Sequence, residues 1–169
     1  MAFPMSAPMP ISVKRAECSR ILSAKPAKNS YPASAESVAN NWHTITWDGP
    51  QVFKAAISKM TEVSFEMMKR HGLDATTLRY FVPHQANMRI IEATARRMGL
   101  PLERCMVNIN RYGNTTAATI PTCLADYEGK LRAGDNLILS SVGGGFTWGA
   151  IYVKWAYDGS RFAPAETEK

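Results

Sequence analysis

Two short segments decide the fold expected for this sequence: HQAN at residues 84–87 and GNTTAATIP at residues 113–121. Each segment offers a side chain that can donate a hydrogen bond to an oxyanion, at the end of an expected strand: His84 in the first and Asn114 in the second. A histidine alone at a strand end is more often structural. Together with the asparagine of the second segment, it predicts a site that stabilises negative charge on oxygen.

The composition of the chain limits which classes of molecule could be its partners. The chain has 169 residues, enough for one hydrophobic core but too few for a large two-domain enzyme. Its net charge of +6 suits an acidic partner, such as nucleic acid, an anionic surface or an acidic carrier protein. No run of 18 apolar residues occurs, so we expect no membrane span. The three cysteines, Cys18, Cys105 and Cys123, form no CxxC pair, which favours a reducing compartment.

The sequence divides near residue 47. Residues 1–47 hold five of the ten prolines, carry more basic than acidic side chains, and show no sustained helical or strand period. Such a segment buries too little apolar surface to offset the entropy of ordering it, so we predict a disordered extension, or an artefactual one translated from sequence unrelated to the fold. Its basic, serine-rich composition also weakly resembles an organelle transit peptide. Residues 158–169 are expected to form a polar tail.

The stretch from residue 48 to residue 157 has regular patterns. Asp48, followed by Pro50, predicts the start of a helix that ends at Gly72. Further helices are expected at residues 87–98 and, despite a proline, 115–128. Strands are expected at 79–82, 106–109, 135–142 and 147–155, the last two joined by the glycines 143–145. This alternation predicts an α/β fold with a mixed sheet and flanking helices.

Four sequence motifs resemble those of a known family and occur in the same order as in that family. They are DG with VFK at residues 48–54, VPHQANMRII at 82–91, NI with YGNTTAA at 108–118, and GGGFTWG at 143–149. The stretch from Asp48 to Trp155 resembles the C-terminal half of β-ketoacyl-acyl-carrier-protein synthase III, a condensing enzyme of the thiolase fold. Residues 48–157 are therefore expected to form one thiolase-like half. Chalcone synthases, which share that fold, are a second possibility, against which the HQAN segment argues.

The resemblance implies a decarboxylative Claisen condensation with acyl-CoA and malonyl-acyl-carrier protein as substrates and no bound cofactor or metal. His84 and Asn114 match the family's His and Asn, which would donate hydrogen bonds to the malonyl thioester oxygen as charge develops there. In this role the histidine keeps a proton on the nitrogen that faces the oxygen. The backbone N–H of Gly144 would bind the oxygen of the acyl group, since glycine allows a close approach of substrate.

The resemblance also implies two binding surfaces. Asn87 would lie along the pantetheine arm, in a channel lined by Phe53, Ala86 and Ile90, although ordinary core packing explains Phe53 and Ile90 equally well. The surface that docks the acidic carrier protein would consist of four basic residues: Lys54, Arg89, Arg96 and Arg97. The alternative is a solvated helix face. We see no interleaved array of aromatic and basic residues that would bind nucleic acid.

The family's nucleophilic cysteine belongs to an N-terminal half that nothing in this sequence matches. Cys105 and Cys123 lack the expected flanking residues, so we interpret them as packing residues. Three hypotheses remain: half of a condensing enzyme, active only if another chain supplies the cysteine half; a carrier-protein binding module without catalysis; or a truncated product without function. A family-type homodimer is expected if the chain is full length. Alone, residues 48–155 are expected to expose apolar surface. A cytoplasmic location is expected, or a plastid if residues 1–47 are a transit peptide.

Overall fold

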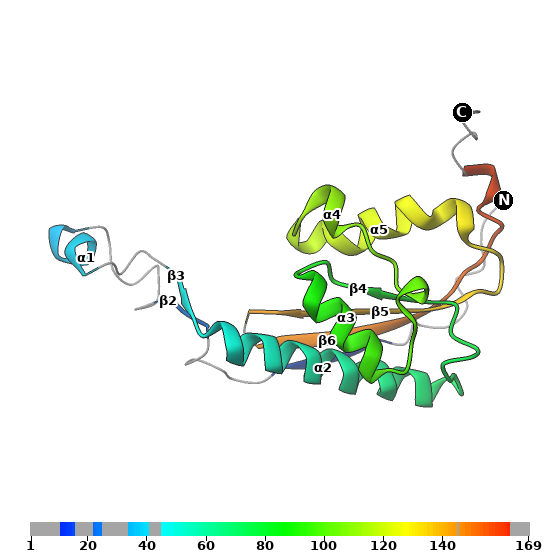
Figure 1. Ribbon diagram of the computed structural model, residues 1–169, viewed down its shortest axis with the longest axis horizontal. Helices are drawn as coiled ribbons and strands as arrows, with labels where there is room; N and C mark the ends of the chain where they lie inside the picture. The colour runs from blue at the N-terminus through cyan, green and yellow to red at the C-terminus, as the bar shows by residue number, and fades with distance from the viewer. Residues whose placement is uncertain (1–10, 16–21, 25–33, 41–44, 145, 163–169) are drawn as a thin grey trace.

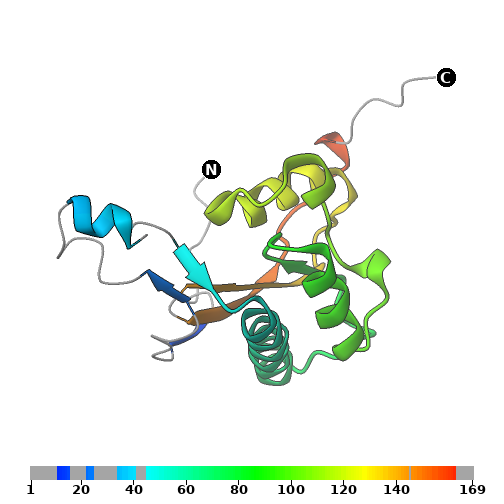
Figure 2. The same cartoon turned by 60° about the vertical axis from the view of Figure 1, so that its left-hand side comes forward.

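A four-stranded mixed sheet lies between two layers of helices (Figures 1 and 2). This computed structural model describes residues 11–15, 22–24, 34–40, 45–144 and 146–162. The strands follow the order β1-β6-β5-β4, in which β4 and β5 are parallel and the other pairs antiparallel. Their bounds are Ile11–Arg15 for β1, Tyr80–Pro83 for β4, Asn136–Gly143 for β5 and Thr147–Lys154 for β6.

Alternation along β5 separates two hydrophobic cores. Ile138 faces the core shared with α2 (Gly49–Arg70) and α3 (Met88–Arg97), whereas Leu137 and Leu139 face the core shared with α5 (Thr119–Tyr127). Successive side chains of a strand point to opposite faces, so one strand contributes to both layers. The predicted α/β fold with a mixed sheet is confirmed.

The remaining helices and strands of the described residues are short. The segment before residue 48 also holds a two-stranded sheet, β2 (Leu22–Ala24) with β3 (Ile45–Trp47), and the helix α1 (Ala35–Ala39). The remaining elements are η1 (Leu102–Arg104), α4 (Ile109–Tyr112), η2 (Thr116–Ala118), η3 (Glu128–Lys130) and η4 (Ser160–Phe162). Among the helices of the described residues, none has both the length and the apolar character of a membrane span.

The strand β1 was missed by the sequence analysis, which expected no ordered element before residue 48. Its five residues pair antiparallel with β6, from Ile11 opposite Ile151 to Arg15 opposite Thr147. A strand of five residues with one alternation of apolar and polar side chains is too short to stand out in a proline-rich segment. The rest of that segment, apart from α1, β2 and β3, lies outside the described residues.

The longest helix, α2, agrees with its sequence signals. The Asp48 side chain accepts a hydrogen bond of 3.0 Å from the backbone N–H of Gln51, and Gly72 follows the helix with φ of +62°. A carboxylate at the N-cap satisfies a donor that has no partner within the helix, and glycine adopts a positive φ at little cost. The face that carries Met60, Val63 and Met67 is buried against the sheet.

The predicted strand at residues 106–109 is wrong. Cys105 forms a single bridge with Phe81, and the helix α4 begins at Ile109. Side chains take the backbone N–H groups that a strand would use for pairing. The Tyr127 hydroxyl accepts from Val107, and the Gln85 amide oxygen accepts from residues 108 and 109. The chain therefore leaves the sheet edge one residue after the bridge.

The predicted helix at 115–128 is confirmed in its centre, but it consists of three pieces. The turn η2 precedes α5, and η3 follows it. Pro121 is the third residue of α5, in the first turn, where the N–H groups have no partner within a helix. Proline is tolerated there because the missing N–H costs no helical hydrogen bond.

The first residues of the predicted polar tail pack against η3. The N–H of Gly159 donates a 2.9 Å hydrogen bond to the Leu131 carbonyl, and the Tyr157 hydroxyl donates to the Glu128 carboxylate. A Cβ atom at position 159 would lie 1.8 Å from the carbonyl oxygen of Glu128, so only glycine fits. Residues 163–169 of the predicted tail lie outside the described residues.

Gly159→Ala is expected to destabilise the protein by about 1–3 kcal/mol, because the new methyl group forces the backbone of residues 157–162 away from η3. Urea unfolding would measure the loss, and hydrogen exchange would show faster exchange of the residue 159 N–H, which donates to the Leu131 carbonyl, and of the Phe162 N–H. Gly49→Ala is the matched control, since a Cβ there meets nothing within 4 Å. Equal stability of the two variants would contradict the packing described.

Candidate active site

His84 directly follows β4, where its backbone is held by the neighbouring strand. Its N–H donates a 2.8 Å hydrogen bond to the carbonyl of Ser140 in β5. The side chain is half-buried, and this burial lowers the pKa of His84 below its ordinary value of 6.5. Taking the imidazolium out of water disfavours the charged form. His84 is therefore a neutral imidazole near pH 7, with one N–H to donate.

Thr119 holds one nitrogen of this imidazole. Its hydroxyl oxygen lies 2.6 Å from His84 Nδ1 and 3.0 Å from the carbonyl oxygen of Thr116. Thr119 is the first residue of α5 and is only 1% exposed. Because Nδ1 is engaged, Nε2 is the nitrogen left to bind a ligand, and it has no hydrogen-bond partner within the described residues.

Asn114 is oriented by a backbone group two residues further along the chain. Its Oδ1 accepts a 2.9 Å hydrogen bond from the N–H of Thr116. The amide NH₂ has no partner in the part of the chain that the structure describes, and the residue is exposed. With the oxygen fixed as the acceptor, the free end of the side chain is a donor. This is the polarity that an oxyanion requires.

The backbone between these residues is strained. Thr116 has φ of +53°, and among the described residues it is the one position outside glycine with a positive φ. A β-branched residue rarely adopts this conformation, which costs on the order of 1–3 kcal/mol and is found mostly at functional sites. The turn brings the N–H of Thr116 to Asn114 and its carbonyl to Thr119.

A continuous series of three hydrogen bonds thus joins the two predicted residues. It runs from His84 Nδ1 to the Thr119 hydroxyl, from the Thr119 backbone N–H to the Thr116 carbonyl, and from the Thr116 N–H to Asn114 Oδ1. The two side chains come from the end of β4 and from the loop before η2, which are thirty residues apart in the sequence. Among the described residues, Asn114 keeps a free NH₂ and His84 keeps a free Nε2, and an NH₂ with an Nε2–H is a set of donors that can stabilise charge on oxygen.

Gln85 fixes both segments and was not singled out by the sequence analysis. The side chain is fully buried and makes four hydrogen bonds to the backbone. Its amide nitrogen donates to the carbonyls of Pro83 (2.7 Å) and Met106 (3.1 Å), and its oxygen accepts from Asn108 (3.1 Å) and Ile109 (3.2 Å). A glutamine two residues after the apolar strand β4 is the signal that could have indicated this role.

A second network holds the loop that leads to Asn114. Asp126 of α5 accepts hydrogen bonds from the Asn108 amide (3.0 Å) and the Tyr112 hydroxyl (3.2 Å), and it forms an ion pair with Arg111. These contacts bind α4 to α5. They place the loop at residues 113–115 beside the start of α5, where Thr119 lies.

Gly144 lies in the turn between β5 and β6 and is exposed, while Gly145 lies outside the described residues. An apolar hollow of about 400 Å³ opens along the same end of the sheet, and it reaches Ile120, next to Thr119, and Ser140, the backbone partner of His84. It is lined mainly by β5 and β6, including Leu139, Thr147 and Ile151. Apolar surface is therefore open to solvent beside the candidate site.

The residues predicted to line a substrate channel differ in their burial and contacts. Asn87 is the N-cap of α3, and its Oδ1 accepts a 2.9 Å hydrogen bond from the Arg89 N–H. Ile90 is buried in the core beneath α3, and Phe53 packs against that core from α2. Ala86 is half-buried. Packing accounts for Ile90, whereas the amide nitrogen of Asn87 and the edge of Phe53 remain accessible.

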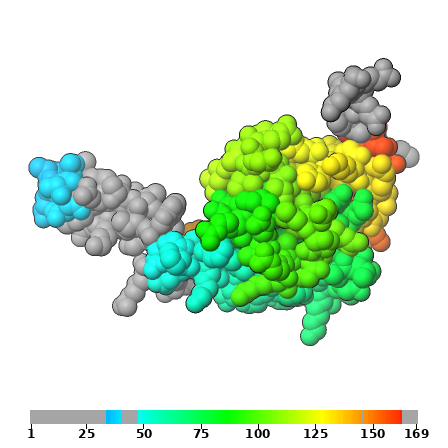
Figure 3. Space-filling view, in the orientation of Figure 1, coloured from blue at the N-terminus to red at the C-terminus, as the bar shows by residue number. Residues whose placement is uncertain are grey.

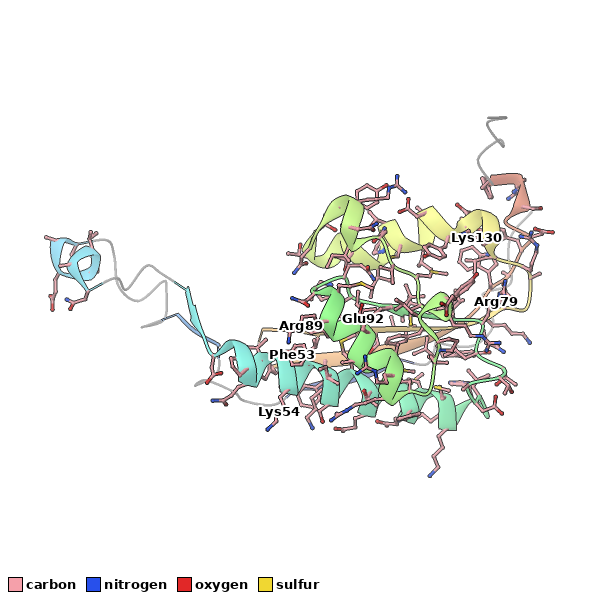
Figure 4. The ribbon with its side chains drawn as sticks, viewed as in Figure 1. Phe53, Lys54, Arg79, Arg89, Glu92 and Lys130 are labelled. Carbon is pink, nitrogen blue, oxygen red and sulfur yellow. The ribbon has the colours of Figure 1, made fainter. Side chains whose placement is uncertain are left out.

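The predicted docking surface extends over α2 and α3, which share one face of the molecule (Figure 3). Arg89 lies over the Phe53 ring, with 5.3 Å between its guanidinium carbon and the ring centroid, and Lys54 lies near them (Figure 4). Lys54, Arg96 and Arg97 are exposed, and no ion pair joins Glu92 to Arg96 among the described residues. Stacking on an aromatic ring orients the guanidinium of Arg89 toward solvent.

The two cysteines of the described chain are unsuited to nucleophilic attack. Burial, with a smaller effect from Glu103, raises the pKa of Cys105 to about 12. Burial, with a smaller effect from Asp126, raises the pKa of Cys123 to about 12 as well. Since the thiolate is the nucleophile, both thiols are almost entirely in the unreactive protonated form near neutral pH. Cys18 lies outside the described residues.

Incubation with acetyl-CoA is therefore expected to leave Cys105 and Cys123 unmodified. Mass spectrometry of proteolytic peptides would locate any acetyl thioester, and iodoacetamide should label both thiols slowly in the native protein and rapidly in urea. Any modification of Cys18, which lies on a separate peptide, is recorded independently. A stable acyl adduct on Cys105 or Cys123 would contradict the inference that these thiols are inert.

No group of three or more His, Cys, Asp or Glu side chains with the arrangement of a metal site occurs within the residues that the structure covers. The site as described consists of neutral donors: an imidazole, a carboxamide and a glycine turn. Such a set can bind a carbonyl oxygen that gains negative charge.

Comparisons with known proteins show the family to which the chain belongs. The family model described as 3-oxoacyl-[acyl-carrier-protein (ACP)] synthase III C terminal matches residues 68–155, which include His84, Asn114 and Gly144. The chain is 56% identical over 129 residues to beta-ketoacyl-[acyl-carrier-protein] synthase III of Porphyromonas gingivalis, covering 76% of this chain and 38% of that protein. The corresponding protein of Chlorobaculum tepidum is 56% identical over 127 residues, with 74% and 39% covered.

Solved structures show the same likeness. The 3-oxoacyl-(acyl carrier protein) synthase III of Pseudomonas aeruginosa superposes with a TM-score of 0.72 at 34% identity, covering 86% of this chain and 43% of that chain. The enzyme of Aquifex aeolicus gives a TM-score of 0.72 at 33% identity. This chain spans less than two-fifths of the Porphyromonas relative. The 129 matched residues outnumber those after position 47, so the similarity reaches into the N-terminal segment.

Proposed function

Given that this chain belongs to the family of 3-oxoacyl-[acyl-carrier-protein] synthase III C-terminal domains, we propose that it supplies the His–Asn side of a condensing active site. The reaction is an acyl transfer of fatty acid biosynthesis, in which acyl-CoA condenses with malonyl-acyl-carrier protein. Both substrates carry a thioester on a pantetheine arm. A cytoplasmic location is proposed, since free thiols suit a reducing compartment.

The proposed chemistry begins with the malonyl thioester. The bond between its α-carbon and the carboxylate breaks, carbon dioxide leaves, and the electron pair moves onto the thioester oxygen to give an enolate. His84 Nε2–H and an Asn114 amide N–H donate hydrogen bonds to that oxygen. Donors already in place stabilise the developing charge without reorganisation. The enolate carbon then attacks an acyl thioester carbonyl and expels a cysteine thiolate, while the N–H of Gly144 binds the acyl oxygen.

The observation that carries this proposal is the hydrogen-bonded series from His84 through Thr119 and Thr116 to Asn114. Within the described residues it leaves the Asn114 NH₂ and His84 Nε2 without a partner. Neither Cys105 nor Cys123 can carry the acyl group, because both thiols are buried and protonated. The nucleophilic cysteine is therefore expected on polypeptide other than the described residues, such as a partner chain that supplies the missing half.

Reconstitution tests this function. The chain is mixed with the N-terminal three-fifths of the Porphyromonas synthase, acetyl-CoA and malonyl-acyl-carrier protein, and the acyl-carrier products are measured by mass spectrometry. We expect acetoacetyl-acyl-carrier protein from the mixture, and neither component alone should form it. The N-terminal polypeptide with its nucleophilic cysteine changed to alanine is the control. A properly folded complex that forms no product would refute the proposal.

A carrier-protein binding module without catalysis is the second candidate. It is supported by the exposed basic residues beside the stacked Arg89 and Phe53 (Figure 4). An acidic carrier protein would be attracted to this face, and a guanidinium can form a bidentate pair with the phosphate of the pantetheine arm. This candidate predicts binding in the titration below but no product in the reconstitution.

The double variant Arg89→Glu/Arg96→Glu is expected to weaken carrier-protein binding about tenfold or more, because two attractive charges become repulsive. Isothermal titration with malonyl-acyl-carrier protein would measure the dissociation constant. Lys130→Glu/Lys154→Glu is the matched control: it changes the net charge equally at exposed sites away from α3 (Lys130 in Figure 4). Equal weakening in both variants would indicate a general charge effect and would refute a docking surface on α3.

A further inference from the structure

The Thr119 hydroxyl lies between two acceptors but has only one hydrogen. Its oxygen is 2.6 Å from His84 Nδ1 and 3.0 Å from the Thr116 carbonyl oxygen. If the hydroxyl donates to the carbonyl, Nδ1 must carry the imidazole proton and Nε2 is a bare acceptor. If it donates to Nδ1, the proton lies on Nε2 and the histidine offers a donor to the site.

Two observations separate these arrangements. The Thr116 carbonyl already accepts a hydrogen bond from the backbone N–H of Thr119, so it does not need the hydroxyl. The contact with Nδ1 is also the shorter of the two, at a distance typical of a hydroxyl that donates to a strong acceptor. We infer that Thr119 donates its hydroxyl proton to His84 Nδ1 and thereby fixes the tautomer that carries its proton on Nε2.

The surroundings of Thr119 make this contact specific. The residue is 1% exposed, so water does not compete for its hydroxyl. Its position at the start of α5 is set by the backbone hydrogen bond from its N–H to the Thr116 carbonyl. The side chain therefore has little freedom to turn away from the imidazole. Among the described residues, no other side chain bonds to His84.

The meaning of this tautomer for catalysis rests on the proposed function. An enolate oxygen needs a donor, and the other tautomer would place a nitrogen lone pair against it. Thr119 would then be a positioning residue: it touches no substrate and acts through His84. The tautomer itself is a property of the resting protein, so it can be tested without substrate and independently of whether the chain catalyses condensation.

The test is an NMR measurement on the full chain labelled with ¹⁵N in its imidazoles, at pH about 8, where His84 is neutral. Long-range correlations from the ring protons distinguish a protonated from an unprotonated ring nitrogen. His84→Gln identifies which of the three histidine signals belongs to His84. We expect Nδ1 unprotonated and Nε2 protonated as a single form. A spectrum with the proton on Nδ1 overturns the inference.

Variants then test the role of the hydroxyl. Thr119→Val keeps the shape but removes the hydroxyl, and it should give a mixture of tautomers, while Thr119→Ser should restore the single form. Thr122→Val is the matched control, because its hydroxyl bonds only to the carbonyls of residues 118 and 119. An unchanged tautomer in folded Thr119→Val overturns the inference. If that variant does not fold, the spectrum of the unaltered protein and of Thr119→Ser decides.

Discussion

His84→Ala is expected to lower the rate of malonyl-acyl-carrier-protein decarboxylation in the reconstituted complex by about 10²–10³-fold. The loss corresponds to one oxyanion donor, or about 3–4 kcal/mol of transition-state stabilisation. The substrate KM should change little, because the thioester oxygen is nearly neutral before carbon dioxide leaves. Conversion of the malonyl to the acetyl carrier protein, followed by mass spectrometry, measures the rate. An unchanged rate in a folded variant would remove His84 from the mechanism.

Asn114→Asp tests the second donor in the same assay. The carboxylate can still accept the hydrogen bond from Thr116, so the loop should keep its conformation. It replaces the free NH₂ with a negative oxygen, and a loss at least as large as that of His84→Ala is expected. Asn110→Asp, at an exposed position of α4, introduces the same charge and serves as the control. Comparable losses in both would show that the added charge, rather than the lost donor, is responsible.

Gln85→Leu is expected to reduce the free energy of unfolding by about 4 kcal/mol. Leucine has a similar volume but leaves two carbonyls and two N–H groups without their partner, and each buried group that loses its hydrogen bond costs about 1–3 kcal/mol. Urea unfolding monitored by circular dichroism measures the change. Because the side chain joins the His84 segment to the loop at 108–109, we also expect slower decarboxylation by the folded fraction.

Gln51→Leu is the matched control for this substitution. The Gln51 side chain is exposed and bonds only to the Asp48 carboxylate, so its loss should change the stability by less than about 0.5 kcal/mol. A loss below about 1 kcal/mol for Gln85→Leu would mean that water satisfies the four backbone groups. The buried glutamine would then have no special role in holding the loop.

Local signals predicted much of this architecture. The N-cap at Asp48 and the glycine at position 72 bound α2 correctly, since capping and positive φ act within a few residues. The apolar runs that became β5 and β6 were equally clear. The same local segments indicated His84 and Asn114, and the hydrogen bonds that join them agree with one shared site.

What the sequence did not reveal depends on contacts between distant residues. The stretch at 106–109 has the composition of a strand, but its N–H groups are taken by Gln85 and Tyr127, which no local pattern connects to it. Thr119 gave no separate signal because its importance comes from His84, thirty-five residues away. The strand β1 became recognisable only through its pairing with β6.

The pairing of β1 with β6 has a consequence for how the protein is made. Ile11 of β1 lies opposite Ile151 of β6. After β1 has been synthesised, the ribosome must therefore add some 140 further residues before β6 exists. At about 5–20 residues per second, that delay lasts on the order of 10 s. During that interval β1 has no neighbouring strand to pair with, and its unpaired backbone groups are open to association with other nascent chains.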